Sequence, residues 1–285
     1  MARRYWVVDA FSDQPLMGNP VAVILDAEGL TTERMQAIAR WTNLSETTFV
    51  LPATVDGADF QLRIFTPASE LAFAGHPTLG SAKAIVESGL HSPRDGKLVQ
   101  QCKAGLVGID VDQATSTFVL ELPDARFIQL PDAAKQGLSA AYAAPLADLP
   151  FTSVDVGIAW GVAEVESVEA LMASRPDPAA CARIETDNNL TGVSLFARYP
   201  DDSIEVRSFA FCDGVPEDPV CGSGNGAVAA YRRHYGQVPE RDWTYASRQG
   251  RCVGRDGHIR LSADSNGQLY VGGQCVVTAR GELAL

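Results

Sequence analysis

Short apolar runs recur along the chain and are separated by polar turn residues. In the first half, "VAVIL" (21–25), "TTFVL" (47–51) and "FQLRIF" (60–65) combine β-branched and aromatic residues, as strands do. The second half contains "VSLFARY" (193–199) and "IEVRSF" (204–209). Turn-forming stretches such as "VDGADF" and "YPDDSI" connect neighbouring runs. The pattern therefore predicts β-hairpins in both halves.

A different spacing of apolar residues predicts three helices. The segment "TTERMQAIARWTN" (31–43) is amphipathic, with apolar positions recurring at helical spacing. Two more segments, 77–88 and 224–236, follow glycine-containing turns and stop near a glycine, the usual signal for a helix end. Strands and helices in this arrangement indicate an α+β protein.

The two halves repeat one pattern. "FQLRIF" (60–65) aligns with "IEVRSF" (204–209), which pairs Arg63 with Arg207. With three extra residues in the second copy, "AGH" (74–76) falls on "CGS" (221–223). The same alignment pairs Glu70 with Glu217. A repeat of such length indicates a duplicated domain and not a solenoid of short units.

We therefore expect two pseudo-symmetric domains, 1–125 and 126–285, with the C-terminal tail completing the second sheet. Proline and alanine become frequent in the segment 122–150, which marks the boundary. Because both copies keep Arg63 and Arg207, a role in the fold is expected for these arginines.

Composition excludes several classes of protein. The chain has 285 residues and is 46% apolar, which is enough for a substantial core. A net charge of −12 argues against nucleic acid or an anionic membrane as a partner. No apolar run is long enough to span a membrane, and "YWVV" near the start is too short for a signal-peptide core, so we expect a cytoplasmic protein. The six cysteines form no CxxC and HExxH is absent, which argues against zinc.

The glycine turns at 74–76 and 221–223 are the first chemical signal. A turn that leads into a helix exposes unpaired N–H groups and the positive end of the helix dipole. If the halves pack about a pseudo-twofold axis, both helix starts can bind a substrate carboxylate. The alternative, that these glycines only shape turns, stays open.

Four ordered motifs resemble the PhzF-like family, the phenazine-biosynthesis isomerases of the diaminopimelate epimerase fold: "DAFSDQPLMGNPVAVIL" (9–25), "NLSETTFV" (43–50), "RIFTPASELAFAGHPTLG" (63–80) and "EDPVCGSGNGA" (217–227). The resemblance implies two similar domains, each a β-barrel around a central helix, with the active site between them. It also implies a homodimer and a proton shift within a dihydro-hydroxyanthranilate, with no metal or organic cofactor.

The resemblance assigns site residues by motif. The acid/base carboxylate falls on Glu46, the histidine of the GHP motif on His76, and the aspartate of the EDP motif on Asp218. Residues expected to contact the substrate are Asn19, Ser45, Gly75, Cys221, Gly222 and Ser223.

Each assignment carries a physical expectation. Desolvation should raise the pKa of Glu46, so that it acts first as a base and then as an acid. His76, at a helix start, should be a neutral imidazole that polarises or hydrogen-bonds the substrate; alternatively it bonds only a backbone carbonyl. Asp218 would accept a bond from a substrate amine or orient His76; alternatively it caps a turn.

Two further expectations concern the second glycine turn. Ser223 should cap the helix and bind the ligand through its N–H group. The Cys221 thiol, at a helix N-terminus, should be acidified, and whether it acts as a base is open.

The turns also discriminate between reactions. Racemases and epimerases that share the fold use a cysteine before each glycine, whereas this chain has Ala74 and Cys221 at those positions. One thiol cannot support a two-thiol exchange, which favours isomerisation by a proton shift. An amino-acid racemase or epimerase and a non-catalytic ligand-binding protein remain the alternatives.

Overall fold

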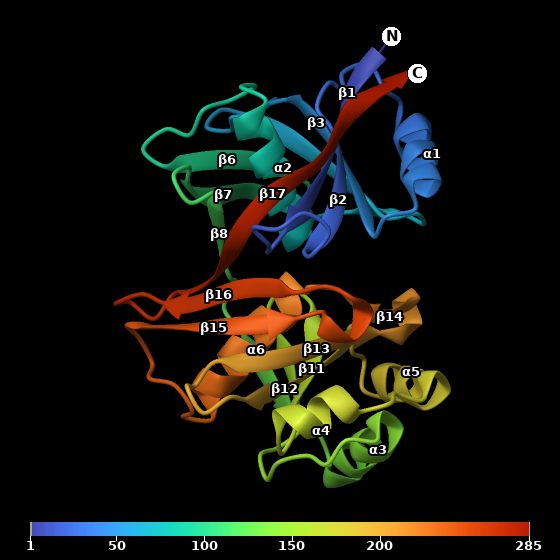
Figure 1. The fold of residues 1–285 in the computed structure, drawn as a ribbon, viewed down its shortest axis with the longest axis vertical. Coiled ribbons are helices and arrows are strands. Elements are labelled where there is room, and N and C mark those ends of the chain that lie inside the picture. Colours follow the sequence, from blue (N-terminus) through green and yellow to red (C-terminus); the bar gives the residue numbers. More distant parts are fainter. Residues whose placement is uncertain (1, 285) are drawn as a thin grey trace. The chain divides into compact units, whose positions relative to one another are not determined.

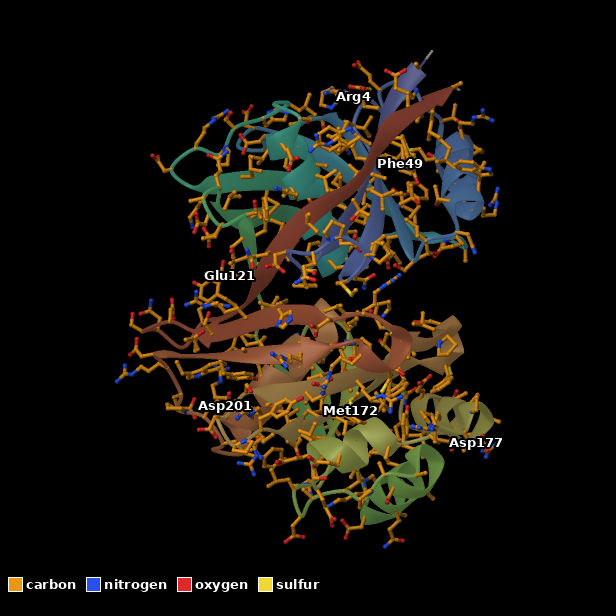
Figure 2. All side chains as sticks on the ribbon, in the orientation of Figure 1. Arg4, Phe49, Glu121, Met172, Asp177 and Asp201 are labelled. Atoms are coloured by element: carbon orange, nitrogen blue, oxygen red, sulfur yellow. The ribbon has the colours of Figure 1, made fainter. Side chains whose placement is uncertain are left out.

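The chain divides into two compact units. A computed structural model describes residues 2–284. The first unit comprises Met1–Leu120 and Gly272–Leu285, and the second comprises Glu121–Val271 (Figure 1). Figure 2 shows the side chains of each unit; Phe49 is fully buried within the first. No helix in the described part of the chain is long and apolar enough to cross a membrane.

The first unit is a closed eight-stranded barrel. Its strands are β1 (Ala2–Ala10), β2 (Asn19–Ile24), β3 (Glu46–Pro52), β4 (Phe60–Phe65), β6 (Lys97–Cys102), β7 (Gly105–Asp112), β8 (Thr117–Glu121) and β17 (Leu269–Ala284). They pair in that order, and β17 returns to β1, beside which it runs in Figure 1. The pairs β2–β3 and β4–β6 are parallel. The short strand β5 (Glu70–Leu71) pairs with β4.

Helix α2 (Gly75–Glu87) packs against β1, β2 and β3 and is the central helix of this barrel. Close approach is possible because the helix is rich in small residues: a Cβ on Gly80 would lie 2.4 Å from Val21 Cγ1. Helix α1 (Thr32–Thr42) packs its apolar side against Phe49 and Phe65, as its amphipathic pattern predicts.

The second unit repeats this order of pairing. Its strands β9 (Arg126–Gln129), β10 (Thr152–Asp155), β11 (Ala159–Glu164), β12 (Gly192–Arg198), β13 (Ile204–Ala210), β15 (Trp243–Gln249) and β16 (Gly257–Ala263) pair in sequence. The parallel pairs β11–β12 and β13–β15 correspond to β2–β3 and β4–β6. Helix α6 (Gly222–His234) packs against β10, β11, β12 and β16, as α2 does in the first unit. A sheet around one central helix is therefore the plan of both units.

The remaining elements of the second unit lie outside this repeat core. They are α3 (Asp132–Tyr142), α4 (Val168–Ala173), α5 (Pro178–Asp187) and the 3₁₀ turns Phe211–Asp213 and Arg251–Val253. Strand β14 (Val215–Asp218), in contrast, pairs with β13 as β5 pairs with β4 in the first unit. Helices α3 and α5 contact each other, and their apolar residues share a core cluster with Leu171 of α4.

One arginine–glutamate pair is built identically in both units. Arg63 Nε and Nη2 donate to the two carboxylate oxygens of Glu70 at 2.7 and 2.8 Å. The same atoms of Arg207 donate to Glu217 at 3.0 and 2.8 Å. Each guanidinium also lies 5.1 Å from the ring of the phenylalanine two residues later. These are the residues that the repeat aligned, and the contacts support the expected role of both arginines in the fold.

The last residues differ from the expectation. The predicted division placed residues 272–285 with the second half and its sheet. In the structure, Leu269–Val271 belong to the second unit, but β17 continues and residues 275–284 pair antiparallel with β1. The barrel of the first unit needs this strand to close. The apolar pattern of the tail predicts a strand without indicating which sheet it joins.

Candidate active site

Glu46 occupies a partly buried corner of the first unit. It is the first residue of β3 and pairs with Val21 of β2. Only 15% of its side chain is exposed. Burial raises the pKa of the Glu46 carboxyl, and a hydrogen bond from the Ser45 side chain opposes this shift without cancelling it. The partial burial and the raised pKa expected for Glu46 are both found, whereas the expected contact of Ser45 with the substrate stays a prediction.

His76 meets Glu46 in this corner. It is the second residue of α2 and 9% of its side chain is exposed. Its Nε2 lies 3.1 Å from Glu46 Oε2, which is hydrogen-bonding distance, although the two groups are not aligned as a hydrogen bond. Loose alignment is common in catalytic pairs without bound substrate. On the other side of the ring, Asn19 Nδ2 lies 3.5 Å from Nδ1.

These contacts bear on which ring nitrogen of His76 carries a proton. If the Asn19 amide donates to Nδ1, the ring proton is on Nε2 and faces the Glu46 carboxylate. The structure thus brings together Asn19, Glu46 and His76, three residues that the motifs selected far apart in the sequence.

The start of α2 carries no side-chain cap. The N-cap residue is Ala74, in an extended conformation, and it has no acceptor to offer. A Cβ on Gly75 would come no closer than 3.8 Å to a side chain, Leu120, so packing within the first unit does not require glycine here. The first N–H groups of a helix lack intrahelical partners, so this turn can present donors to an anion.

The start of α6 is capped by a thiol. Cys221 Sγ accepts a hydrogen bond from the Gly224 N–H at 3.2 Å. Burial raises the pKa of this thiol, and the nearby Asp218 charge acts in the same direction. The expected acidification is therefore wrong: Cys221 is only 5% exposed, and the helix start does not offset the loss of solvation.

Ser223 is not the helix cap, which corrects a second expectation. It is the second residue of α6, after the buried Gly222. Its Oγ accepts a hydrogen bond from Trp160 Nε1 at 3.1 Å and lies 3.6 Å from Cys221 Sγ.

Asp218 shapes the turn before α6. Its Oδ1 accepts from the Val220 N–H at 3.0 Å, and its carbonyl oxygen accepts from Gln249 Nε2 at 2.9 Å. The turn-capping alternative describes these contacts. Gln249 Oε1 in turn accepts from the Cys221 N–H and from Asn225 Nδ2, so a buried amide network holds this turn in place.

No role was assigned from the sequence to Trp160, Gln249 or Asn225, which support the second turn, although Asn225 lies within the motif at 217–227. Gln249 lies outside the four motifs, in a stretch without a local signal of this role. Trp160 lies in "GIAWGV", a stretch that aligns only weakly with the first half. Their role comes from tertiary contacts that sequence spacing does not reveal.

The second unit has no carboxylate at the position equivalent to Glu46. Thr47 pairs with Phe65, and Val193 pairs with Phe209, so the residue before each, Glu46 or Gly192, occupies the same place in the repeat. A Cβ on Gly192 would lie 2.2 Å from the Phe209 carbonyl oxygen and 2.7 Å from Trp160 Cζ3. No larger residue fits there without rearrangement.

Comparison with known proteins agrees with this geometry. The profile of a family described as "Phenazine biosynthesis-like protein" matches residues 8–281. A Schizosaccharomyces pombe protein named antisense-enhancing sequence 1 is 38% identical over 286 residues, with 96% of each chain covered. A trans-2,3-dihydro-3-hydroxyanthranilate isomerase from Pseudomonas aeruginosa is 35% identical, covering 93% of this chain and 92% of its own.

Solved structures share the fold. The Bacillus anthracis phenazine biosynthesis protein of the PhzF family superposes with a TM-score of 0.88 at 25% identity, over the full length of both chains. The expected fold of two similar units, each a β-barrel around a central helix, is confirmed.

Proposed function

The chain belongs to the phenazine biosynthesis-like protein family and is an isomerase of the PhzF type, and from this premise we propose that Glu46 carries the proton that the reaction moves. The observation that supports this role is the buried Glu46–His76 pair, with 3.1 Å between Oε2 and Nε2. A carboxyl with a raised pKa holds a proton more tightly than an ordinary glutamate, which suits a group that must both remove and return one.

In the proposed reaction, the Glu46 carboxylate removes a proton from a substrate carbon and returns it to another carbon on the same face. His76, with its proton on Nε2, hydrogen-bonds a substrate oxygen or the carboxylate itself and stabilises the charge that develops between the two steps. Asn19 holds the imidazole ring through Nδ1. Neither step needs a second base.

The proposed substrate is a small cyclic carboxylate. The Pseudomonas aeruginosa relative is named for trans-2,3-dihydro-3-hydroxyanthranilate, and this compound is the first candidate. In the first unit the Gly75 amide, and in the second the amides of Gly222 and Ser223, are proposed donors to substrate oxygens. Ser45 would contact the substrate beside Glu46, and Asp218 would accept from a substrate amine.

The racemase alternative is disfavoured by the chemistry of the two turns. Ala74 has no thiol, and the pKa of the Cys221 thiol is raised, so neither supplies a second base. A Glu46 base with Gly192 at the equivalent position is asymmetric, whereas a two-base racemase needs a base on each face of the substrate.

The decisive experiment follows trans-2,3-dihydro-3-hydroxyanthranilate by NMR in heavy water. The wild-type protein should convert it and place deuterium at the carbon that gains the proton. The Glu46→Gln variant keeps the shape but not the proton carrier, and should be inactive. Glu28→Gln is the matched control, because residue 28 is exposed and follows the far end of β2 from Val21, which pairs with Glu46. Turnover retained by Glu46→Gln would reject the role of Glu46.

A panel of other cyclic carboxylates tests the wider substrate class. Deuterium exchange on another member would keep the proton-shift reaction and change only the substrate. Tight binding of a ligand without any exchange would instead favour the non-catalytic alternative.

The quaternary state is proposed from the resemblance, and the location from apolar runs that are too short to span a membrane. A cytoplasmic homodimer is expected, and light scattering should give twice the 30.4 kDa of one chain. A mass of one chain at micromolar concentration would contradict this proposal without touching the chemistry.

A further inference from the structure

Trp160 makes a hydrogen bond that the proposed reaction has not yet used. The residue lies on β11 and is 4% exposed. Its indole Nε1 donates to Ser223 Oγ at 3.1 Å. Ser223 is half-buried at the start of α6, whereas the indole is enclosed within the second unit.

The equivalent position of the first unit holds the Glu46–His76 contact in place of the Trp160–Ser223 hydrogen bond. Val21 of β2 pairs with Glu46, and Trp160 of β11 pairs with Gly192 at the equivalent step of the repeat. In the first unit the strand side chain, Glu46, reaches the second residue of the central helix at 3.1 Å. In the second unit the indole fills the space left by Gly192 and reaches the second residue of its central helix at the same distance.

The direction of this bond fixes the role of the Ser223 hydroxyl. An indole N–H only donates, so Ser223 Oγ must accept from Trp160. The other neighbour is Cys221 Sγ at 3.6 Å, a weak partner that already accepts from the Gly224 N–H. The hydroxyl proton of Ser223 is therefore available for a stronger acceptor.

We propose that Trp160 is a positioning residue that holds Ser223 as a hydrogen-bond donor toward an oxygen of the bound substrate. The proposal rests on the proposed function, in which Ser223 contacts a small carboxylate. An oxyanion or hydroxyl oxygen is favoured beside Ser223, and an ammonium group is disfavoured. Trp160 itself does not touch the substrate.

A double-mutant cycle on trans-2,3-dihydro-3-hydroxyanthranilate tests the coupling. Ser223→Ala should raise KM about three- to tenfold, the usual effect of one lost hydrogen bond, and leave kcat nearly unchanged. Replacing Trp160 with β-(3-benzothienyl)alanine keeps the bicyclic shape and removes only the donor, so it should raise KM by a similar or smaller factor. In the Ser223→Ala background the same replacement should have no further effect, because the bond is already lost.

The outcomes separate positioning from packing. Additive effects of the two changes, or a change in kcat alone, would overturn the proposal. Trp160→Phe is a second variant that removes the N–H by standard mutagenesis. Trp41→Phe is the matched control, because this tryptophan is 71% exposed and lies on α1.

An NMR measurement distinguishes failure of this inference from failure of the proposed function. The chain has four tryptophans, so loss of one indole signal in Trp160→Phe assigns Nε1. Ser223→Ala should shift this signal and speed its exchange with solvent; an unchanged signal would overturn the inference. If the bond is present but the wild-type protein neither converts nor binds the carboxylate, the proposed function fails and the substrate-directed part of the inference falls with it.

Discussion

Both units share one position of the repeat, the first residue of a strand beside the second residue of the central helix, and only the first unit has a carboxylate and a histidine there. In the first unit the partly buried Glu46 and the buried His76 meet at 3.1 Å. In the second unit Gly192 replaces the carboxylate, and Trp160 donates to Ser223. The strand order, the parallel pairs and the arginine–glutamate contacts are shared by both units. Duplication has therefore preserved the scaffold, while the second residue of the central helix and its strand partner have diverged in chemistry.

The largest effect should come from removing the carboxylate that the second unit lacks. Glu46→Gln should lower kcat by about 10²- to 10⁴-fold, the usual contribution of a positioned acid/base group. The comparison predicts no such loss of kcat for a change at Trp160 or Ser223, which form the equivalent contact in the second unit. Steady-state kinetics on a substrate that the wild-type protein converts would measure the factor. A decrease of less than about tenfold would show that proton transfer does not depend on this carboxylate.

The shared arginine–glutamate contact should differ in stability between the units. Arg207 has 6% of its side chain exposed, and its Nη1 also donates to the Leu171 and Ser174 carbonyl oxygens. Arg207→Met leaves Glu217 buried and unpaired, and should cost about 3–5 kcal/mol.

Arg63→Met is the matched change in the first unit. Arg63 is 22% exposed, and Lys103 would still pair with Glu70 at 2.7 Å. We expect a cost of about 1–3 kcal/mol, measured by urea denaturation of both variants. Equal costs, or a larger cost for Arg63→Met, would contradict the expectation that the Arg207–Glu217 contact contributes more to the free energy of unfolding than the Arg63–Glu70 contact.

Much of this comparison is readable in the sequence, but part of it is not. Aligning Arg63 with Arg207 located the repeat, and the motifs selected Glu46 and His76. The apolar pattern of the tail cannot show that β17 closes the first barrel, because such a pattern does not indicate which strand will pair with it. The cap of α6 and the raised pKa of Cys221 depend on burial among residues distant in sequence. The role of Trp160 could not be predicted either, because its hydrogen bond to Ser223 joins residues that are distant in the sequence.

An added methyl group should affect the stability of the fold differently at Gly192 in the second unit and at Gly75 in the first. Gly192→Ala forces a Cβ to 2.2 Å from the Phe209 carbonyl oxygen, and should destabilise the fold by about 1–3 kcal/mol. Gly75→Ala meets only Leu120 Cδ1 at 3.8 Å and should leave the free energy of unfolding within about 0.5 kcal/mol. Chemical denaturation measures both. A destabilised Gly75→Ala would mean that glycine is needed there for the fold and not for the ligand.

Cys221→Ala should affect activity less than any change at Glu46. Its thiol has a raised pKa and caps α6, so the variant should lose about 1 kcal/mol of stability and keep kcat within about threefold. A loss of kcat as large as that expected for Glu46→Gln would show that Cys221 also carries a proton, and would contradict the view that only the first unit supplies a proton carrier.

The smallest predicted effect is a pH dependence of stability. The pKa of Glu46 is raised above its ordinary value of 4.5 in the folded protein, so folding favours the protonated form. Its contribution is fully present below pH 4.5 and is lost as pH rises through the folded pKa. Glu46→Gln should therefore gain stability relative to the wild-type protein as pH rises, by urea denaturation at several pH values. A difference that shrinks with rising pH would contradict the assigned shift.

The central claim, one proton carrier in the first unit, is tested most directly by the configuration of substrate recovered part-way through reaction in heavy water. If Glu46 acts alone on one face, the recovered substrate keeps its configuration, the product carries deuterium where the proton is delivered, and Glu46→Gln shows neither conversion nor exchange. Recovered substrate with inverted configuration at the exchanged carbon, or exchange at the wild-type rate in Glu46→Gln, would contradict the account.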